Sequence, residues 1–148
     1  GDNGADTISD RYGVDTLIGG KGRDDLNAVD TVLGASDVLR GNRGQDDLAG
    51  DDGDTLIGGA HSDDFFVYVK TGGAVVEIAD LDLALDETLG LFDSSGKGLT
   101  ATDLADDVTL ADSADGAVVS HDGTAVALIS GVTVAELDAA GDWLLPTA

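Results

Sequence analysis

The chain has 148 residues, no cysteine and a formal net charge of −23 at pH 7, from 30 acidic and 7 basic residues. This charge disfavours binding to nucleic acid or to an anionic membrane surface, because both require basic patches. The lack of cysteine excludes disulfides and thiolate metal sites, and no stretch approaches the ~18 apolar residues of a membrane span.

A repeating unit fills residues 1–66. Seven times, an aspartate lies two positions before an isolated large apolar residue, with glycines just upstream. Successive aspartates are 9, 9, 13, 9, 8 and 9 residues apart, and the apolar residues take the same steps. A disordered Gly/Asp-rich linker, which the composition alone would allow, has no reason to keep this coupling. The seven pairs are Asp6/Ile8, Asp15/Leu17, Asp24/Leu26, Asp37/Leu39, Asp46/Leu48, Asp54/Leu56 and Asp63/Phe65.

The glycine–aspartate pattern is typical of calcium binding. Calcium takes roughly six to eight oxygen ligands and accepts backbone carbonyls as well as carboxylates. One aspartate per repeat is too few, so the backbone must direct carbonyl oxygens at the ion, which glycine permits. We expect the last three residues of each repeat to form a short strand with its apolar residue inward, so that stacked copies bury a continuous stripe.

Residues 19–27 are the clearest copy, and the whole run resembles the repeats-in-toxin (RTX) family. The resemblance implies an all-β fold: a right-handed parallel β-roll of nonapeptide repeats over residues 1–66, followed by a β-rich C-terminal cap with short helices over residues 67–148. Two consecutive repeats would make one turn. Loops two repeats apart would then lie on the same edge and share several calcium ions.

The resemblance also predicts two unequal edges. Asp10 and Arg11 replace leading glycines on the second edge, residues 28–31 look inserted, and the loop 50–54 is one residue short. We therefore expect good calcium sites on the first edge and weak or absent binding on the second. The expected first-edge ligands are Gly1, Asn3, Gly4, Asp6, Gly19, Gly20, Lys21, Gly22, Asp24, Gly41, Asn42, Arg43, Gly44, Asp46, Gly58, Gly59 and Asp63. The second-edge ligands are Asp15, Asp37, Gly50, Gly53 and Asp54.

The acidic charge predicts that calcium is a condition of folding. Residues 1–66 carry 15 acidic and 5 basic residues, a net charge of −10, and residues 67–148 carry 15 and 2, a net charge of −13. Such self-repulsion opposes compaction. Divalent cations bound between carboxylates would relieve it.

The second half contains different signals. Residues 65–69 predict a strong strand, alternation resumes over residues 75–83, and residues 115–130 predict a hairpin around His121-Asp122-Gly123. Thr133 and Thr100 begin capping-box patterns that predict two short helices. Together these elements would cover the open end of the repeat stack.

This half is similar to the region that follows the repeats in serralysin-type proteases and other type I-secreted proteins. The likeness is carried by residues 63–68, 78–91 and 131–145. It implies a calcium site using Asp80 and Asp86, although Val76 stands where the family often has an aspartate. It also implies an uncleaved C-terminal secretion signal for the type I secretion apparatus and a secreted, extracellular or cell-surface location.

No catalytic constellation is visible: the HExxH zinc motif is missing, and His61 and His121 stand alone. We therefore expect a non-enzymatic, calcium-binding C-terminal RTX module of a secreted bacterial protein, with calcium-induced folding after type I secretion, no nucleic acid partner and no membrane insertion. One alternative is a module of an alginate-epimerase-like enzyme that binds acidic or neutral polysaccharide. Another is a structural segment of an RTX adhesin or surface-layer protein. The polysaccharide groove would use Arg11, Tyr12, Lys21, Arg23, Arg40 and Arg43.

Overall fold

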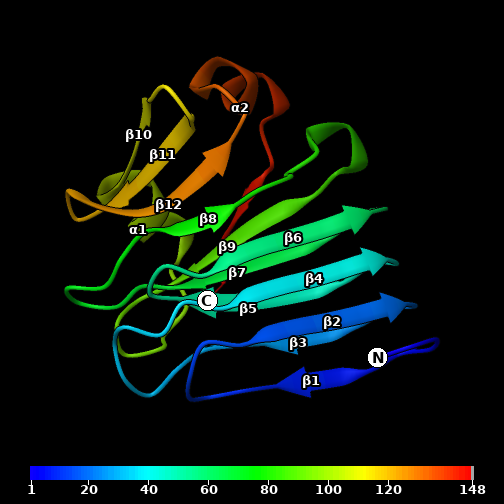
Figure 1. The fold of residues 1–148 in the computed structure, drawn as a ribbon. Helices are drawn as coiled ribbons and strands as arrows, with labels where there is room; N and C mark the ends of the chain where they lie inside the picture. Colours follow the sequence, from blue (N-terminus) through cyan, green and yellow to red (C-terminus); the bar gives the residue numbers. More distant parts are fainter. Residues whose placement is uncertain (148) are drawn as a thin grey trace.

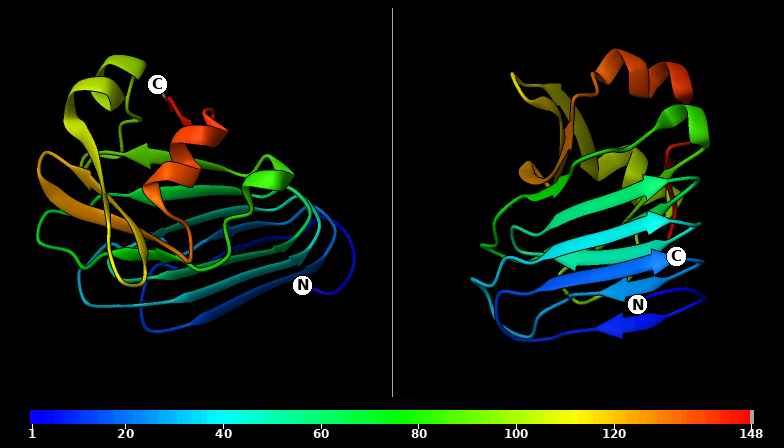
Figure 2. Two further views of the ribbon diagram at one scale, coloured as in Figure 1. Left: turned by 90° about the horizontal axis from the view of Figure 1, so that it is seen from above. Right: turned by 45° about the vertical axis from the view of Figure 1, so that its right-hand side comes forward.

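The computed structural model describes residues 1–147, whose strands form two sheets (Figure 1). In spatial order, the first sheet contains β1 (Thr7–Ser9), β3 (Asp25–Asn27), β5 (Asp47–Asp51), β7 (Asp64–Tyr68), β9 (Thr88–Phe92) and β13 (Leu144–Leu145). The second contains β10 (Val108–Asp112), β11 (Gly116–His121), β12 (Thr124–Ser130), β8 (Val76–Ile78), β6 (Thr55–Ala60), β4 (Val38–Arg43) and β2 (Thr16–Lys21). Successive strands from β1 to β9 alternate between the sheets, so the chain winds around a flattened stack (Figure 2).

The repeat strands pair in parallel and in register, which places their apolar residues in two columns. Leu26, Leu48 and Phe65 are each fully buried, as expected for residues that point between two packed sheets. The column of the first sheet is Ile8, Leu26, Leu48, Phe65, Leu89 and Leu144. The column of the second sheet is Leu17, Leu39, Leu56, Ile78 and Ile129. All eleven column residues belong to the hydrophobic core or pack against it, so their burial contributes to the apolar driving force of the fold.

Strand length differs between the sheets. The predicted three-residue strands are confirmed for β1 and β3, but β2, β4 and β6 each span six residues. They are longer because the glycine-containing pairs that open the next repeat, such as Gly19-Gly20 and Gly58-Gly59, continue the strand. These glycines therefore lie at the ends of the second-sheet strands, where the chain turns toward the first sheet.

The C-terminal half extends both sheets in parallel. β9 pairs with β7 and β13 with β9, while β8 pairs with β6 and β12 with β8. The boundary expected between the repeats and the cap, at residues 66 and 67, falls inside β7. The predicted hairpin is confirmed as the antiparallel pair β11–β12. The alternation over residues 75–83 corresponds to the short strand β8, which ends at Ile78, and the Asp80 carboxylate then accepts hydrogen bonds from the N–H groups of Gly58 and Gly59.

Three short helices complete the described part of the chain. Both predicted capping boxes are confirmed, at Thr100 for α1 (Ala101–Asp107) and at Thr133 for α2 (Val134–Ala140). A 3₁₀ helix, η1 (Leu83–Leu85), follows Asp82, whose side chain accepts from the Ala84 N–H. Among the described residues, no helix is long and apolar enough to cross a bilayer.

The fold predicts that the repeats depend on the strands that follow them. A fragment of residues 1–68 would expose Phe65 and Leu56, which Leu89 and Ile78 cover in the full chain. A solenoid that leaves its terminal apolar residues open loses stability. We therefore expect the fragment to need a markedly higher calcium concentration to gain β-structure than the full chain, as followed by circular dichroism. Equal calcium midpoints and equal steepness would show that residues 69–148 are dispensable for folding.

Candidate cation-binding edges

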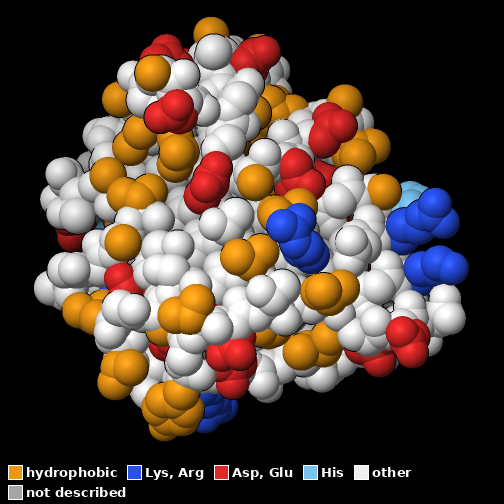
Figure 3. Space-filling view, in the orientation of Figure 1, with side chains coloured by type: hydrophobic (Ala, Val, Ile, Leu, Met, Phe, Trp, Pro, Cys, Tyr) orange, Lys and Arg blue, Asp and Glu red, His pale blue; other side chains and the backbone are white. Residues whose placement is uncertain are grey.

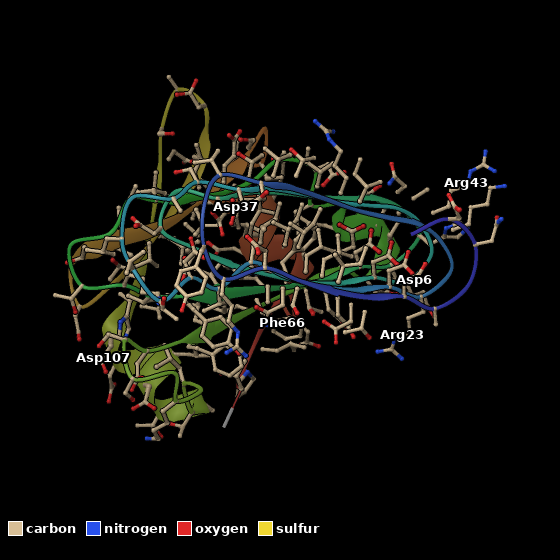
Figure 4. All side chains as sticks on the ribbon, turned by 60° about the horizontal axis from the view of Figure 1, so that its bottom comes forward. Asp6, Arg23, Asp37, Arg43, Phe66 and Asp107 are labelled. Atoms are coloured by element: carbon tan, nitrogen blue, oxygen red, sulfur yellow. The ribbon has the colours of Figure 1, made fainter. Side chains whose placement is uncertain are left out.

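The repeat aspartates form two columns on opposite edges of the stack. We call the column of Asp6, Asp24, Asp46 and Asp63 the first edge and the column of Asp15, Asp37 and Asp54 the second edge. Figure 4 shows Asp6 and Asp37 at opposite ends of the flattened cross-section. On the first edge, Oδ1 of each aspartate after Asp6 accepts a hydrogen bond from the backbone N–H of the aspartate one turn earlier. The donor-to-acceptor distances are 2.9 Å for Asp6 to Asp24, 2.8 Å for Asp24 to Asp46 and 2.8 Å for Asp46 to Asp63.

The second carboxylate oxygen of every first-edge aspartate is unpaired. Oδ2 of Asp6, Asp24, Asp46 and Asp63 is buried and has no hydrogen-bond partner among the described residues. Asp24 and Asp63 are completely buried and Asp46 is 1% exposed. A buried, ionised carboxylate without a partner costs several kcal/mol. Four such oxygens in one column therefore require either bound cations or protonation.

Glycines leave open the space in front of these oxygens. A Cβ added to Gly19 would lie 2.5 Å from Asp24 Oδ2, and one added to Gly1, Gly41 or Gly58 would lie closer still to Oδ2 of the aspartate in its own repeat. The Cβ positions of Gly1 and Gly41 would also lie 2.6 Å and 2.7 Å from the carbonyl oxygens of the glycines one turn on. Carboxylate and carbonyl oxygens of adjacent turns thus converge on a cradle that any larger residue would fill.

Glycines with positive φ also allow a close approach between the loops of neighbouring turns. Gly22 and Gly44 have φ values of 130° and 145°, and a Cβ on Gly22 or Gly44 would collide with the carbonyl group of Gly4 or Gly22, respectively. Glycine is needed here both for the backbone angle and for this approach. The donor set of the first edge is therefore made of carboxylate and carbonyl oxygens, which suits a hard cation such as Ca²⁺ and not a nitrogen- or sulfur-seeking metal.

The second edge has the same carboxylate ladder but fewer free oxygens. Asp37 Oδ1 accepts from the Asp15 N–H at 2.6 Å, and Asp54 Oδ1 accepts from the Asp37 N–H at 2.7 Å. Asp37 Oδ2 is buried and unpaired, whereas Asp54 Oδ2 accepts from the Asp51 N–H at 2.8 Å. Asp15 is exposed to solvent. The repeat residues of this edge therefore offer a weaker cation site than those of the first edge.

Sequence reasoning missed two acidic residues near the second edge. Asp30 and Asp51 are 2% and 0% exposed. Both Asp30 oxygens and Asp51 Oδ1 have no hydrogen-bond partner among the described residues, whereas Asp51 Oδ2 lies 3.0 Å from Lys70 Nζ. Asp30 lies in the inserted residues 28–31, and Asp51 stands where the clearest repeat has a second glycine. The sequence could have revealed both residues, because the inserted residues 28–31 and the shortened loop 50–54 each contain an acidic residue.

The first edge continues beyond the last repeat through Glu87. Asp64 pairs with Thr88, so Glu87 lies opposite Asp63, in the position of a repeat aspartate one turn on. It is 2% exposed, and its Oε2 accepts from the Asp82 N–H at 2.8 Å. Glu87-Thr88-Leu89 has the repeat spacing of acid and hydrophobe, so the sequence contained the signal.

Asp80 and Asp86, which were expected to share a calcium site, differ in their contacts and exposure. Both Asp80 oxygens accept from loop N–H groups, at 2.8 Å from Gly58 and 3.0 Å from Gly59. Asp86 is exposed and ends η1 with a left-handed backbone, at a φ of 56°. Glu87 is therefore the buried acid that continues the column after Asp63.

A further group of side chains lies in the C-terminal half. Asp107, His121 and Asp122 have ligand atoms within 4.8 Å of one another, in a cluster that includes the turn between β11 and β12. The sequence led us to expect that His121 stands alone, but the fold brings Asp107 to it. Asp122 is exposed, and exposed acidic groups of this kind are stable without a cation.

Burial shifts the ionisation of the column. It raises the pKa of Asp63 from 3.8 to about 6 and that of Glu87 from 4.5 to about 8, chiefly through loss of hydration and further through neighbouring carboxylates. The same cause raises the pKa of Asp54 to about 7. Burial therefore makes the ionised form of these three acids less favourable than in water, and a bound cation would compensate for this.

No protein-family model, curated protein or solved structure matches this chain significantly.

The raised pKa values predict that protons can partly replace cations. Each of these acids has a higher pKa folded than unfolded, so its stabilising contribution is full below about pH 4 and is lost as pH rises through 6 to 8. In chelator, acidification from pH 8 to pH 5 should therefore increase β-structure by circular dichroism. Calcium binding at pH 6 to 7 should release protons, measurable by calorimetry in buffers of different ionisation enthalpy. A chelated chain with the same spectrum at both pH values would contradict this expectation.

Proposed function

We propose that the chain is an RTX-type calcium-binding module, a right-handed parallel β-roll that folds when calcium binds along the first edge. One observation carries the proposal: four stacked aspartates each have a buried, unpaired Oδ2 next to a glycine whose Cβ would fill the same space. Only Gly, with no side chain, leaves room for an ion there. The buried aspartates and parallel strands support this family assignment.

Each first-edge aspartate would act on two neighbours. Through Oδ1, Asp46 accepts the N–H of Asp24 and so ties one turn to the next. Through Oδ2 it would hold the cation together with loop carbonyls such as Gly58 O. Calcium would supply the positive charge that makes this column of ionised carboxylates compatible with burial. Cation binding and turn stacking would then be one cooperative event, as in other small metal-dependent domains.

The proposed role follows from this coupling. Extracellular calcium modules typically bind at roughly 10⁻⁴ to 10⁻³ M, so a chain of this kind stays unfolded where calcium is scarce and folds where it is abundant. We propose that it serves as the C-terminal module of a secreted bacterial protein. It would pass the type I secretion apparatus unfolded and fold outside the cell. In this role the module itself is not an enzyme.

Polysaccharide binding is the second candidate. Its support is a small basic group: Lys21 pairs with Arg43 across β2 and β4, and Lys and Arg side chains gather at that end of the molecule (Figure 3). The aromatic part of the expected groove is not beside them, because Tyr12 lies in the loop that leads to Asp15 on the second edge. Calcium binding is therefore the function that the geometry supports best.

The proposal predicts calcium-dependent folding. With chelator at pH 7.5 the chain should be largely disordered, and millimolar calcium should convert it to β-structure, followed by circular dichroism. Magnesium at the same concentration should not replace calcium, since it dehydrates reluctantly and requires tight octahedral geometry. An unchanged folded spectrum in chelator, at neutral pH, would refute the proposal.

The column predicts an unequal effect of two adjacent substitutions. Asp24→Asn should lower the apparent calcium affinity about tenfold or more, because it removes charge at a buried residue in the middle of the first edge. Asp25→Asn is the matched control, since Asp25 is exposed and follows directly in sequence. Calcium titrations of both variants by calorimetry and circular dichroism test this. Equal losses in the two variants would mean that overall charge matters and the column does not.

A further inference from the structure

The carboxylate column of the second edge ends differently from that of the first. Thr55 pairs with Glu77, so Val76 lies opposite Asp54, in the position of the next repeat aspartate. Val76 is 1% exposed and offers no ligand. The first edge instead continues with the acidic Glu87 in the equivalent position. An apolar residue thus closes the second column.

A lysine from the loop between β7 and β8 contacts residues at the second edge. Lys70 Nζ lies 3.0 Å from Asp51 Oδ2 and donates a hydrogen bond of 2.6 Å to the carbonyl oxygen of Asp30. The Lys70 side chain is 25% exposed, whereas that of Asp51 is fully buried. The ammonium group therefore bridges two turns of the stack, from the loop that follows β7 to the residues that precede β4.

The oxygens around Lys70 are of the kind found around the first-edge cradles. One is a carboxylate oxygen of Asp51, the last residue of β5, and the other is the backbone carbonyl oxygen of Asp30, in the loop between β3 and β4. An ammonium carries one positive charge and three donors that such oxygens accept. The charge of Lys70 also lowers the pKa of Asp30 and of Asp51, against the burial that raises both.

We propose that Lys70 is the resident cation of the second edge and occupies the position that a divalent cation takes on the first. The inference rests on the proposed calcium function and adds that the cap-proximal end of the second edge closes without calcium. Its consequence is a latent divalent site. Asp30 has both carboxylate oxygens buried and unpaired, and Asp37 Oδ2 and Asp51 Oδ1 are unpaired as well. Removal of the ammonium would leave the three carboxylates of Asp30, Asp37 and Asp51 without a positive charge beside them, which favours entry of a divalent ion.

The test is Lys70→Met, which keeps an unbranched stem of four heavy atoms and removes the ammonium group. We expect this variant to bind one more calcium ion per chain than the unaltered protein, counted by native mass spectrometry. Its calcium-induced folding should have a midpoint about threefold higher or more, because a buried carboxylate has lost its partner. Lys97→Met is the matched control, since Lys97 is exposed and lines the same surface hollow as Lys70. It should change neither value.

A second variant keeps the inference falsifiable if Lys70→Met folds poorly. Lys70→Met combined with Asp51→Asn removes both charges of the pair and should restore the ion count of the unaltered protein and most of its stability in urea. An unchanged ion count and midpoint in Lys70→Met would overturn the inference, as would a double variant no better than the single one. If the unaltered protein binds no calcium, the proposed function fails by itself. The urea comparison of the single and double variants still decides whether Lys70 holds the second edge together.

Discussion

Repulsion between identical carboxylates is the constraint on which this fold depends. A stack of parallel, in-register turns places each repeat residue directly over its copy, with neighbouring strands about 4.8 Å apart. The register that stacks Leu26, Leu48 and Phe65 into a buried column therefore also stacks Asp24, Asp46 and Asp63. Like charges directly opposite one another destabilise a sheet. The apolar column therefore forms only when the charge of the acidic column is compensated, by protonation or by cations, and under the proposed function cation binding and core formation would be coupled.

The molecule meets this constraint in two ways. On the first edge the Oδ2 atoms of the carboxylates are unpaired and the glycines leave the space before them open, so an external cation could enter there. On the second edge Asp54 uses its Oδ2 for the Asp51 N–H, and Lys70 contributes an internal positive charge. The two edges share one backbone ladder but differ in where their positive charge comes from. Under the proposed function, such a division would let one edge respond to calcium while the other supports the stack.

The column members were predicted because the resemblance to RTX repeats implies two repeats per turn, so a simple count assigns each aspartate to an edge. It also predicted the hairpin and both capping boxes, which are local patterns. Glu87 was missed because its distance from Asp63 is 24 residues, whereas successive first-edge aspartates are 18, 22 and 17 residues apart. Lys70 and Asp30 were missed for a similar reason. Their meeting depends on how loops of unequal length fold across the second edge, which spacing alone does not encode.

Burial of the apolar and acidic columns increases along the stack, from the N-terminal repeat toward the C-terminal half. At its N-terminal end the apolar column ends in the half-buried Ile8, and Asp6 is only partly buried. Toward the C-terminal half the column contains the fully buried Phe65 and Leu89, and Lys70 supplies a cation that needs no binding from solution. The least costly turn to form is therefore the one beside β8 and β9. Each further turn then gains a preformed apolar surface and one face of a cation cradle, as nearest-neighbour coupling in a solenoid requires. Folding that starts at this end and proceeds toward residue 1 would match the order in which a chain exported C-terminus first meets calcium.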